Sequence, residues 1–371
     1  MSASGPDTVL IVGGGPAGLA TAIAARLAGL PATVIEASTP PLDKACGEGL
    51  MPDAVESLRR LGVRIPEDER HVFRGIRYLA AEGVAEACFP SGQGFGVRRT
   101  ALHRALVRRA EEVGVDLRWG LRVEGLDGCR IDTPGGPLEG DWLVAADGLR
   151  SRLRRWAALD GSPARHRRFG VRRHFALAPW TDLVEVYWAD GFEAYVTPVA
   201  ANQVGVAFLW EGRKASFGEL LQGVPDLARR LSGAKASSRD RGCGPLEQRV
   251  RAVAKGRLAL VGDASGYLDA ITGEGLALAF HQAFALVEAI RAGDLRAYAR
   301  AHRRIARLPD ALTRTLLYAE RHPELRRRLI ALLARDPQLF RQFLGVHART
   351  LRLRELGWSG LLRLARGLLP A

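Results

Sequence analysis

Cysteine and methionine are scarce in this chain of 371 residues, which contains four cysteines and two methionines. Cys88, Cys129 and Cys243 are scattered without C-x-x-C or other metal-ligand spacing, and the eight histidines form no H-E-x-x-H pattern. We therefore expect neither a disulfide framework nor a metal site. His103 and His281 fall in predicted helices, where we interpret them as helix-face residues.

Long apolar runs are also missing, since no stretch reaches the roughly 18 uninterrupted apolar residues of a transmembrane helix. Met1 to Asp7 carries no basic and apolar leader, and we expect it to be a short disordered lead-in. The sequence contains no internal repeat and no long low-complexity linker. These absences predict a cytoplasmic protein, with association at a membrane surface as an alternative.

Lysine is rare, because arginine supplies 50 of the 54 basic residues, and the formal net charge is +14. Residues 301–371 contain fifteen arginines and five acidic residues, which gives them a net charge of +10. Leu325 to Leu333 and Leu351 to Leu369 mix arginine with leucine at helical spacing, which is typical of a solvated helical bundle or of helices on an anionic membrane. No DNA- or RNA-binding motif accompanies the charge, so we expect no nucleic-acid partner.

The N-terminal segment has the pattern of a nucleotide-binding strand, turn and helix. Thr8 to Val12 is a short apolar run that predicts a buried parallel strand, and Pro16 to Leu27 predicts a helix. Between and within them, Gly13, Gly15 and Gly18 match G-x-G-x-x-G, with Ala17 inside the motif. Such glycines let the backbone approach a pyrophosphate, whose charge is stabilised at the helix N-terminus. The alternative interpretation is an ordinary glycine-rich turn with no role in nucleotide binding.

A second predicted strand, Ala32 to Ile35, ends at Glu36, which follows Gly18 by eighteen residues. A carboxylate at this position can accept hydrogen bonds from both ribose hydroxyls of an adenosine, and it disfavours a 2′-phosphate. FAD and NAD share this fingerprint, so segments further along the chain must distinguish them.

Two later segments carry a family resemblance. Asp141 to Arg154 predicts a buried strand that runs into Asp147-Gly148, and Gly262-Asp263 follows a strand at Leu258 to Val261. Together they resemble the D-G and G-D motifs of the p-hydroxybenzoate-hydroxylase-like flavoproteins, to about residue 300. The resemblance implies non-covalent FAD with Asp263 at the ribityl chain. It also implies that Asp147 and Gly148 support both FAD and a passing NAD(P)H.

Arg99, in V-R-R-T-A-L-H, matches the R-x-x-L position of the same family, which implies an arginine near the FAD phosphates. The alternative interpretation is a solvated helix start, because pairs of charges such as Arg98 and Arg99 are common there.

Gly273-Glu274-Gly275 precedes a predicted helix that ends at Gly293. A helix N-terminus aimed at the pyrimidine edge of a flavin would stabilise the negative charge that develops there on reduction. A carboxylate facing the ring would oppose this effect, so we expect the Glu274 side chain to point away from it.

Lys44 to Leu50 reads K-A-C-G-E-G-L and is similar to a segment of the geranylgeranyl reductases, as are G-D-A-S-G and T-G-E-G. The resemblance implies that this segment lies beside flavin and substrate. Cys46 is then the candidate catalytic residue, because a thiol there could protonate a substrate carbon; small buried cysteines are otherwise packing residues. Ala270 stands where these relatives have proline, and Gly266 where aromatic hydroxylases have histidine.

These motifs leave several functions open. The leading hypothesis is an NAD(P)H-dependent FAD monooxygenase that hydroxylates a hydrophobic aromatic or polyketide-like molecule. The alternative is reduction of isoprenoid carbon–carbon double bonds, as in the geranylgeranyl reductases. A flavin-dependent halogenase comes third, because the W-x-W-x-I-P segment is missing. A non-catalytic flavin-binding protein is the remaining option.

The predicted fold class is α/β, with a Rossmann-like FAD-binding domain interleaved with an antiparallel-sheet substrate domain and followed by a helical region. We assign 1–70, 98–162 and 246–300 to the FAD-binding domain, 71–97 and 163–245 to the sheet domain, and 301–371 to the helical region. The sheet segments alternate aromatic and β-branched residues, which predicts one face toward a ligand. A cluster of aromatic residues there would suit a flat or lipophilic substrate, although aromatic residues of sheets more often belong to the core. The cluster comprises Trp180, Tyr187, Trp188, Phe192, Tyr195, Phe208 and Trp210.

Overall fold

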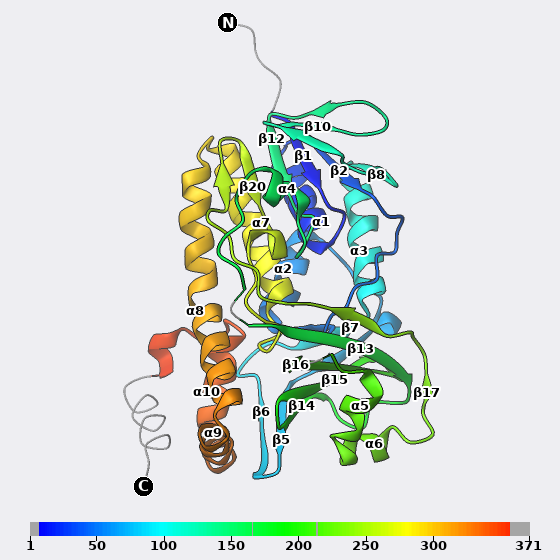
Figure 1. The fold of residues 1–371 in the computed structure, drawn as a ribbon, viewed down its shortest axis with the longest axis vertical. Coiled ribbons are helices and arrows are strands. Elements are labelled where there is room, and N and C mark those ends of the chain that lie inside the picture. Colours follow the sequence, from blue (N-terminus) through cyan, green and yellow to red (C-terminus); the bar gives the residue numbers. More distant parts are fainter. Residues whose placement is uncertain (1–6, 165, 213, 357–371) are drawn as a thin grey trace, which may run out of the picture.

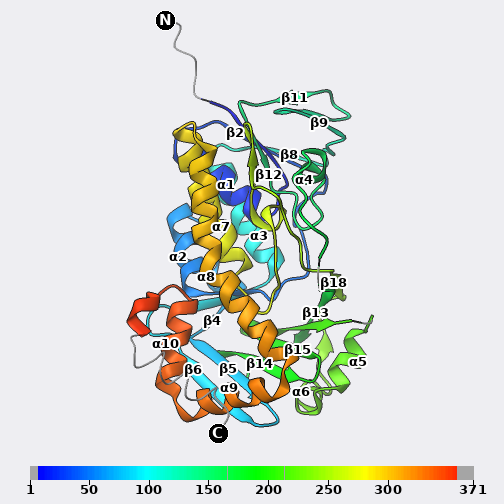
Figure 2. The same ribbon diagram turned by 60° about the vertical axis from the view of Figure 1, so that its left-hand side comes forward.

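The computed structural model describes residues 7–164, 166–212 and 214–356. Two sheets lie one above the other along the long axis, and helix α8 (Leu295–Arg321) runs beside both (Figure 1). Figure 2 shows the same helix passing from the upper sheet to the lower one. The lead-in expected at Met1 to Asp7 lies outside the described residues except for Asp7.

The upper sheet has six strands in the order β19-β20-β12-β1-β2-β8. Its strands are β1 (Val9–Val12), β2 (Ala32–Glu36), β8 (Asp116–Trp119), β12 (Trp142–Ala145), β19 (Ala254–Lys255) and β20 (Leu258–Leu260). All neighbours pair in parallel except β19 and β20. Strand β1 lies at the centre, where both faces are covered, which explains its uninterrupted apolar sequence.

Different elements cover the two faces of this sheet. Ile11 packs with the helices on one face, and Leu10 packs with the small sheet on the other. The helices are α1 (Pro16–Leu27), α2 (Pro52–Leu61), α3 (Arg99–Glu112) and α7 (Gly275–Arg291). The small sheet contains β9 (Gly125–Asp127), β10 (Arg130–Asp132) and β11 (Leu138–Glu139), and the short helix α4 (Arg152–Trp156) follows β12.

The lower sheet has eight strands, in the order β17-β13-β16-β15-β14-β5-β6 with β18 also paired to β13. They are β5 (Gly75–Ala80), β6 (Gly83–Cys88), β13 (Arg168–Ala176), β14 (Leu183–Ala189), β15 (Phe192–Ala200), β16 (Gln203–Glu211), β17 (Lys235–Ala236) and β18 (Arg241–Cys243). Only β5 and β14 pair in parallel. A three-stranded sheet of β3 (Gly49–Leu50), β7 (Gly94–Val97) and β4 (Arg70–Phe73) accompanies it.

Both faces of the lower sheet are packed against helices. Helices α5 (Phe217–Gln222) and α6 (Pro225–Arg230) cover one face, whose core includes Tyr187, Phe208 and Trp210. Helices α9 (Pro323–Arg335) and α10 (Pro337–His347) pack with the other face, where Trp188 is buried. Of the two interpretations of the sheet aromatics, packing in the core therefore holds for these four side chains, because the helices bury them.

The upper six-stranded sheet draws its strands from 1–70, 98–162 and 246–300, and the eight-stranded sheet draws its strands from 71–97 and 163–245. Helix α8 runs without interruption across residue 300. The domain boundaries themselves stay a prediction. Of the two arginine- and leucine-rich stretches, 325–333 lies in α9, whereas most of 351–369 lies outside the described residues. Among the described helices, none is both long enough and apolar enough to cross a bilayer.

Candidate functional site

The turn after β1 and the first turn of α1 each contain a position that accepts only glycine. Gly13 has a φ of 115°, and a side chain there would overlap the backbone carbonyl of Ala146. A Cβ on Gly18 would overlap the carbonyl oxygen of Gly13. Gly15 is the extended N-cap of α1 and offers no side chain to the free N–H groups of the first turn. The helix therefore starts with unpaired donors, as an anion site requires.

Glu36, at the end of β2, lies against this turn. One carboxylate oxygen accepts a hydrogen bond from Gly14 N–H at 2.9 Å, and the other accepts one from Ser38 N–H at 2.9 Å. These bonds hold the carboxylate beside the glycine turn. Its proposed contact with ribose stays a prediction.

The two later motifs meet at the same edge of the sheet. Asp147 Oδ2 accepts hydrogen bonds from the backbone N–H groups of Arg152 and Leu153, at 2.7 and 3.2 Å. Asp147 Oδ1 is buried and has no hydrogen-bond partner among the described residues. Gly148 has a φ of 79°, and a Cβ on it would lie 3.6 Å from Lys44 Nζ.

Gly262 and Asp263 form the start of a 3-10 turn directly after β20. A Cβ on Gly262 would lie 2.6 Å from the Cβ of Ala17, so this turn packs directly on the first turn of α1. Asp263 is accessible to solvent, yet enough protein surrounds it that burial raises its pKa, while Arg99 and Lys44 act to lower it. Its carboxylate therefore shares one site with these two cations.

Arg99 is the first residue of α3, and its guanidinium faces the site. A Cβ on Gly15 would lie 4.0 Å from Arg99 Nη2. Arg99 Nε is buried and has no hydrogen-bond partner among the described residues. Arg99 is thus partly buried, and its place near the FAD phosphates stays a prediction.

Cys46 lies in the connection between β2 and β3, beside the same cation. Its Sγ accepts a hydrogen bond from Glu48 N–H at 3.3 Å. Burial raises the pKa of the Cys46 thiol, and Glu48 adds to this effect while Arg99 and Arg172 oppose it. The group is therefore a neutral thiol at neutral pH.

Gly273, Glu274 and Gly275 form the turn that leads into α7. Gly273 has a φ of 70°, and Glu274 is the N-cap of the helix. The Glu274 carboxylate is buried and lies 3.3 Å from His347 Nε2 of α10. Its side chain therefore turns toward the C-terminal helices, which leaves the N–H groups of α7 without a side-chain cap.

Comparison with known proteins identifies this arrangement. A family model described as "FAD binding domain" matches residues 7–196. The menaquinone reductase of Mycobacterium tuberculosis is 30% identical over 74% of each chain, and that of Mycolicibacterium smegmatis is 30% identical over 72% of each. The chain belongs to this FAD-binding family. This flavoprotein is an FAD-dependent oxidoreductase of the p-hydroxybenzoate-hydroxylase-like superfamily.

Other relatives of the flavoprotein are named for different activities. The FAD-dependent monooxygenase OpS4 of Beauveria bassiana is 34% identical over 40% of this chain and 39% of its own. A flavoprotein/dehydrogenase structure from Cytophaga hutchinsonii superposes with a TM-score of 0.81 at 18% identity, over 94% of each chain. The flavin-dependent brominase Bmp2 superposes with a TM-score of 0.80 at 19% identity, over 98% of each. At these identities the two solved structures show a shared fold alone.

The residues of this site fit FAD. The uncapped start of α1 suits the pyrophosphate, and Arg99 supplies a cation beside it. The unpartnered Asp147 Oδ1 and the accessible carboxylate of Asp263 can accept hydrogen bonds from hydroxyl groups. The flavoprotein would therefore hold the dinucleotide with residues from these four segments, which meet only in the fold.

His103 has a role that its sequence context did not predict. Its ring lies on α3, is fully buried, and its Nε2 is hydrogen-bonded to Gly14 O at 2.9 Å. Burial lowers the pKa of His103, so the ring is neutral and supports the glycine turn as a hydrogen-bond donor. The spacing contains a signal for this role, because His103 follows Arg99 by one helical turn. His281, in contrast, pairs with Asp53 at 3.2 Å.

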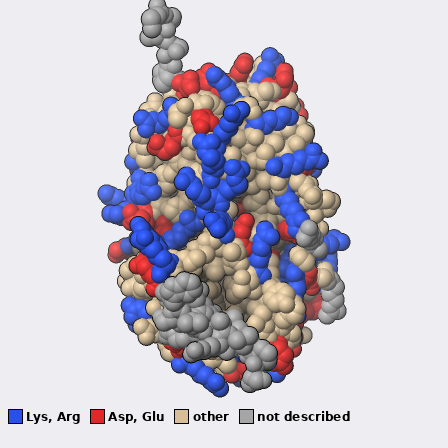
Figure 3. Space-filling model, turned by 90° about the vertical axis from the view of Figure 1, so that its left-hand side faces the viewer, with Lys and Arg blue, Asp and Glu red and all other residues tan. Residues whose placement is uncertain are grey.

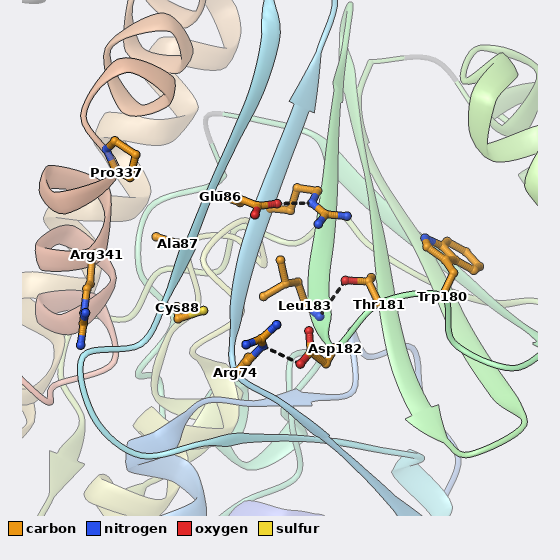
Figure 4. A pocket seen from close by; sticks show the side chains of 11 residues that line it. Arg74, Glu86, Ala87, Cys88, Trp180, Thr181, Asp182, Leu183, Pro337 and Arg341 are labelled. Atoms are coloured by element: carbon orange, nitrogen blue, oxygen red, sulfur yellow. Dashed lines mark hydrogen bonds and ion pairs between the residues drawn. The ribbon is translucent and has the colours of Figure 1, made fainter.

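A separate surface pocket of about 500 Å³ lies at the edge of the lower sheet (Figure 4). Its arginines are already paired, Arg74 with Asp182 at 2.5 Å and Arg77 with Glu86 at 2.7 Å. None of its lining residues belongs to the flavin site, so we assign it no part in the chemistry.

Proposed function

We propose that this flavoprotein takes electrons from NADH or NADPH and reduces a carbon–carbon double bond in an isoprenoid chain, such as that of a prenylated quinone. The observation that carries the proposal is the neutral thiol of Cys46, which is half-buried, accepts a hydrogen bond from Glu48 N–H and lies beside Arg99. The name of the mycobacterial relatives, menaquinone reductase, supports reduction of a lipophilic quinone-like molecule.

Reduction of a double bond adds a hydride to one carbon and a proton to the other. FAD, when bound, supplies the hydride, and the nicotinamide restores it. Cys46 is placed to supply the proton, because its thiol is neutral and lies within the cluster that holds the flavin. Donation leaves a thiolate, which recovers its proton from water. No other co-reactant is required.

Two neutral side chains, Tyr267 and Cys243, lie close enough to Cys46 to interact with it electrostatically. Tyr195, Tyr267 and Cys243 lie partly buried against the core between the lower sheet and the C-terminal helices. Burial raises the pKa of both tyrosines, which therefore stay neutral, and Tyr195 donates its hydroxyl to Ile271 O at 3.0 Å. A substrate in this region would meet neutral tyrosine rings, with the carboxyl groups of Asp263 and Asp269 nearby.

Hydroxylation is the second candidate. One relative, OpS4, is named as an FAD-dependent monooxygenase, and the uncapped N-terminus of α7 suits a reduced flavin in either reaction. Halogenation is the third, supported only by the fold shared with solved halogenases.

Oxygen dependence tests the proposal. The FAD-loaded enzyme is incubated under strict anaerobiosis with NADH or NADPH and with menaquinone or geranylgeranyl diphosphate. We expect a product that has gained two hydrogens at a double bond. A product that forms only in air and contains an added oxygen would support hydroxylation instead. Product formation that requires halide as well as air would support halogenation.

We also propose that the arginine-rich helices contact anionic phospholipid. Arg296, Arg300, Arg303, Arg304 and Arg307 recur at helical spacing on the exposed side of α8. Lys and Arg gather on the molecular face shown in Figure 3. A bilayer surface with negative headgroups has the complementary charge, and it is where an isoprenoid lipid resides.

Vesicle sedimentation tests this contact with the full chain, because α8 is continuous across residue 300. The variant R303E/R304E/R307E should lose binding to vesicles of phosphatidylglycerol. The control R64E/R108E/R239E changes the total charge equally but on other elements, and it should still bind. Equal loss in both variants would show a nonspecific charge effect and would contradict the proposal.

A further inference from the structure

Glu48 joins two parts of the flavin site, although it belongs to neither nucleotide motif. Its carboxylate Oε1 accepts a hydrogen bond from Arg99 N–H at 2.8 Å. Its backbone N–H donates to Cys46 Sγ at 3.3 Å, and its carbonyl oxygen accepts from Val97 N–H at 2.9 Å. The residue is 3% exposed and has a φ of 60°, a left-handed conformation that is uncommon for a side chain of this size.

The other carboxylate oxygen, Oε2, is hydrogen-bonded to Nε2 of the fully buried His174 on β13. His174 Nδ1 lies 3.0 Å from Arg172 Nη1 and 2.8 Å from Ser238 Oγ. A guanidinium can only donate, so Nδ1 accepts and the ring proton sits on Nε2. His174 therefore donates to Glu48, and the chain of donors that begins at Arg172 ends on the Glu48 carboxylate.

Strands β13 and β15 hold the rest of the connection. Arg172 Nη2 donates to Asp43 Oδ1 at 2.6 Å and to Lys44 O at 3.3 Å. Thr197 Oγ1, from β15, donates to Gly47 O at 2.9 Å. Hydrogen bonds thus attach residues 43–49 to the lower sheet. Glu48 extends these attachments to the start of α3.

We infer that Glu48 and His174 are positioning residues that clamp the 43–49 segment and the start of α3 together, so that Cys46 and Arg99 are held in register for FAD. This clamp affects both the affinity for FAD and the reactivity of the Cys46 thiol. It applies whichever reaction the flavoprotein catalyses.

Glu48→Gln isolates this role, because glutamine keeps the shape but not the acceptors. Its amide oxygen can serve either Arg99 N–H or His174 Nε2–H, and its NH₂ group then faces the other donor. His174 cannot resolve the conflict by moving its proton, because Nδ1 already faces the Arg172 donor. One of the two buried donors, Arg99 N–H or His174 Nε2–H, then faces the NH₂ group of the glutamine and has no acceptor.

The test measures three quantities in E48Q: the FAD dissociation constant by flavin fluorescence, the rate of Cys46 alkylation by iodoacetamide read by peptide mass spectrometry, and the pH profile of that rate. We expect FAD binding about tenfold weaker and Cys46 alkylation about tenfold faster, as for the loss of a buried hydrogen bond. The alkylation profile should also move to lower pH, because the Glu48 charge is gone.

Glu185→Gln is the matched control. Glu185 is also a fully buried carboxylate, but it lies on β14 and accepts from Arg77, Trp180 and Tyr187. E185Q should leave FAD affinity and Cys46 alkylation close to those of the unsubstituted protein. Unchanged values in E48Q, or equal changes in both variants, would overturn the inference.

A milder pair of variants covers the case in which E48Q does not fold. Ser238→Ala removes the hydroxyl that also accepts from His174 N–H at 3.0 Å, whereas the neighbouring Ser237 hydroxyl accepts from Gln203. S238A should accelerate Cys46 alkylation, and S237A should not. Equal rates in these two variants would also overturn the inference.

Discussion

The carboxylate of Glu274 lies 3.3 Å from Nε2 of His347, which connects the N-cap of α7 to the last turn of α10. Both side chains are buried, with exposed fractions of 4% and 5%. Burial alone would lower the pKa of His347, but Glu274 and Asp53 outweigh it and raise that pKa above its usual value. The C-terminal helices are thus tied electrostatically to the flavin side of the molecule.

His347→Gln should therefore destabilise the protein in a pH-dependent way. A histidine whose folded pKa is raised contributes stability in full below its unfolded pKa of about 6.5, and this contribution is lost as pH rises through the folded pKa. We expect a loss of about 1–3 kcal/mol at pH 6 that becomes smaller toward pH 9. Urea unfolding across this range measures it. His322→Gln, at an exposed ring, is the control, and an equal loss at every pH would contradict the prediction.

Gly18→Ala should abolish FAD binding, because the new Cβ would overlap the carbonyl oxygen of Gly13 in the nucleotide turn. The control is Gly29→Ala. Gly29 has a φ of 83°, but a Cβ added there would have no atom within 4 Å, so this variant should keep FAD at a cost of about 1–3 kcal/mol in stability. Flavin absorbance after gel filtration measures retention. Full flavin content in G18A would show that the turn does not bind the cofactor.

Cys46→Ala should separate the two half-reactions of the proposed reductase. Removing the proton donor should lower the turnover number about 100-fold or more, since general acid catalysis has this magnitude. Reduction of the flavin by NADH or NADPH, followed at its absorbance band, should stay close to normal. Cys88→Ala, at an exposed cysteine, is the control. Normal turnover in C46A would remove Cys46 from the mechanism.

Glu193→Gln should make stability less dependent on pH. Arg168 is buried among Glu193 at 2.6 Å, Asp269 at 3.0 Å and Glu320 at 3.6 Å, so three carboxylates share one guanidinium. Burial raises the pKa of Glu193 to about 8, even though Arg168 opposes the shift. A carboxyl with a raised folded pKa contributes stability below its unfolded value, and this contribution is lost as pH rises through about 8.

Urea unfolding between pH 5 and pH 9 should therefore show the unsubstituted protein losing about 2 kcal/mol or more relative to E193Q. Glu86→Gln, which removes an exposed carboxylate paired with Arg77, should give a flat difference over the same range. A flat difference for E193Q as well would show that Glu193 is ionised throughout.

The local elements were predictable because their signals are contiguous in sequence. The helix predicted at Pro16 to Leu27 has these bounds in the structure, and the strand predicted from Thr8 begins one residue later, at Val9. Fixed φ at proline, the glycine turn and the apolar strand each act over a few residues. The flavin motifs were recognisable for the same reason.

For the aromatic residues of the lower sheet, the sequence pattern alone could not decide between the core and a ligand-facing surface. Alternation along β14 predicts two different faces, but it does not say what covers each of them. Helices α5 and α6 come from a later part of the chain and bury Tyr187 and Phe208, while α9 and α10 pack with the face that carries Trp188. The packing partner, rather than the strand pattern, decided that these rings are core.

The sequence by itself determined the FAD-binding fold class, the glycine turn, and the segments that carry Glu36, Arg99, Asp147 and Asp263, because each is encoded by neighbouring residues. Only the tertiary structure decided that Glu48 meets His174. These residues are 126 positions apart, and each is an ordinary polar residue in its own segment. A buried charge needs a partner from whichever element packs against it, and no local pattern specifies that partner.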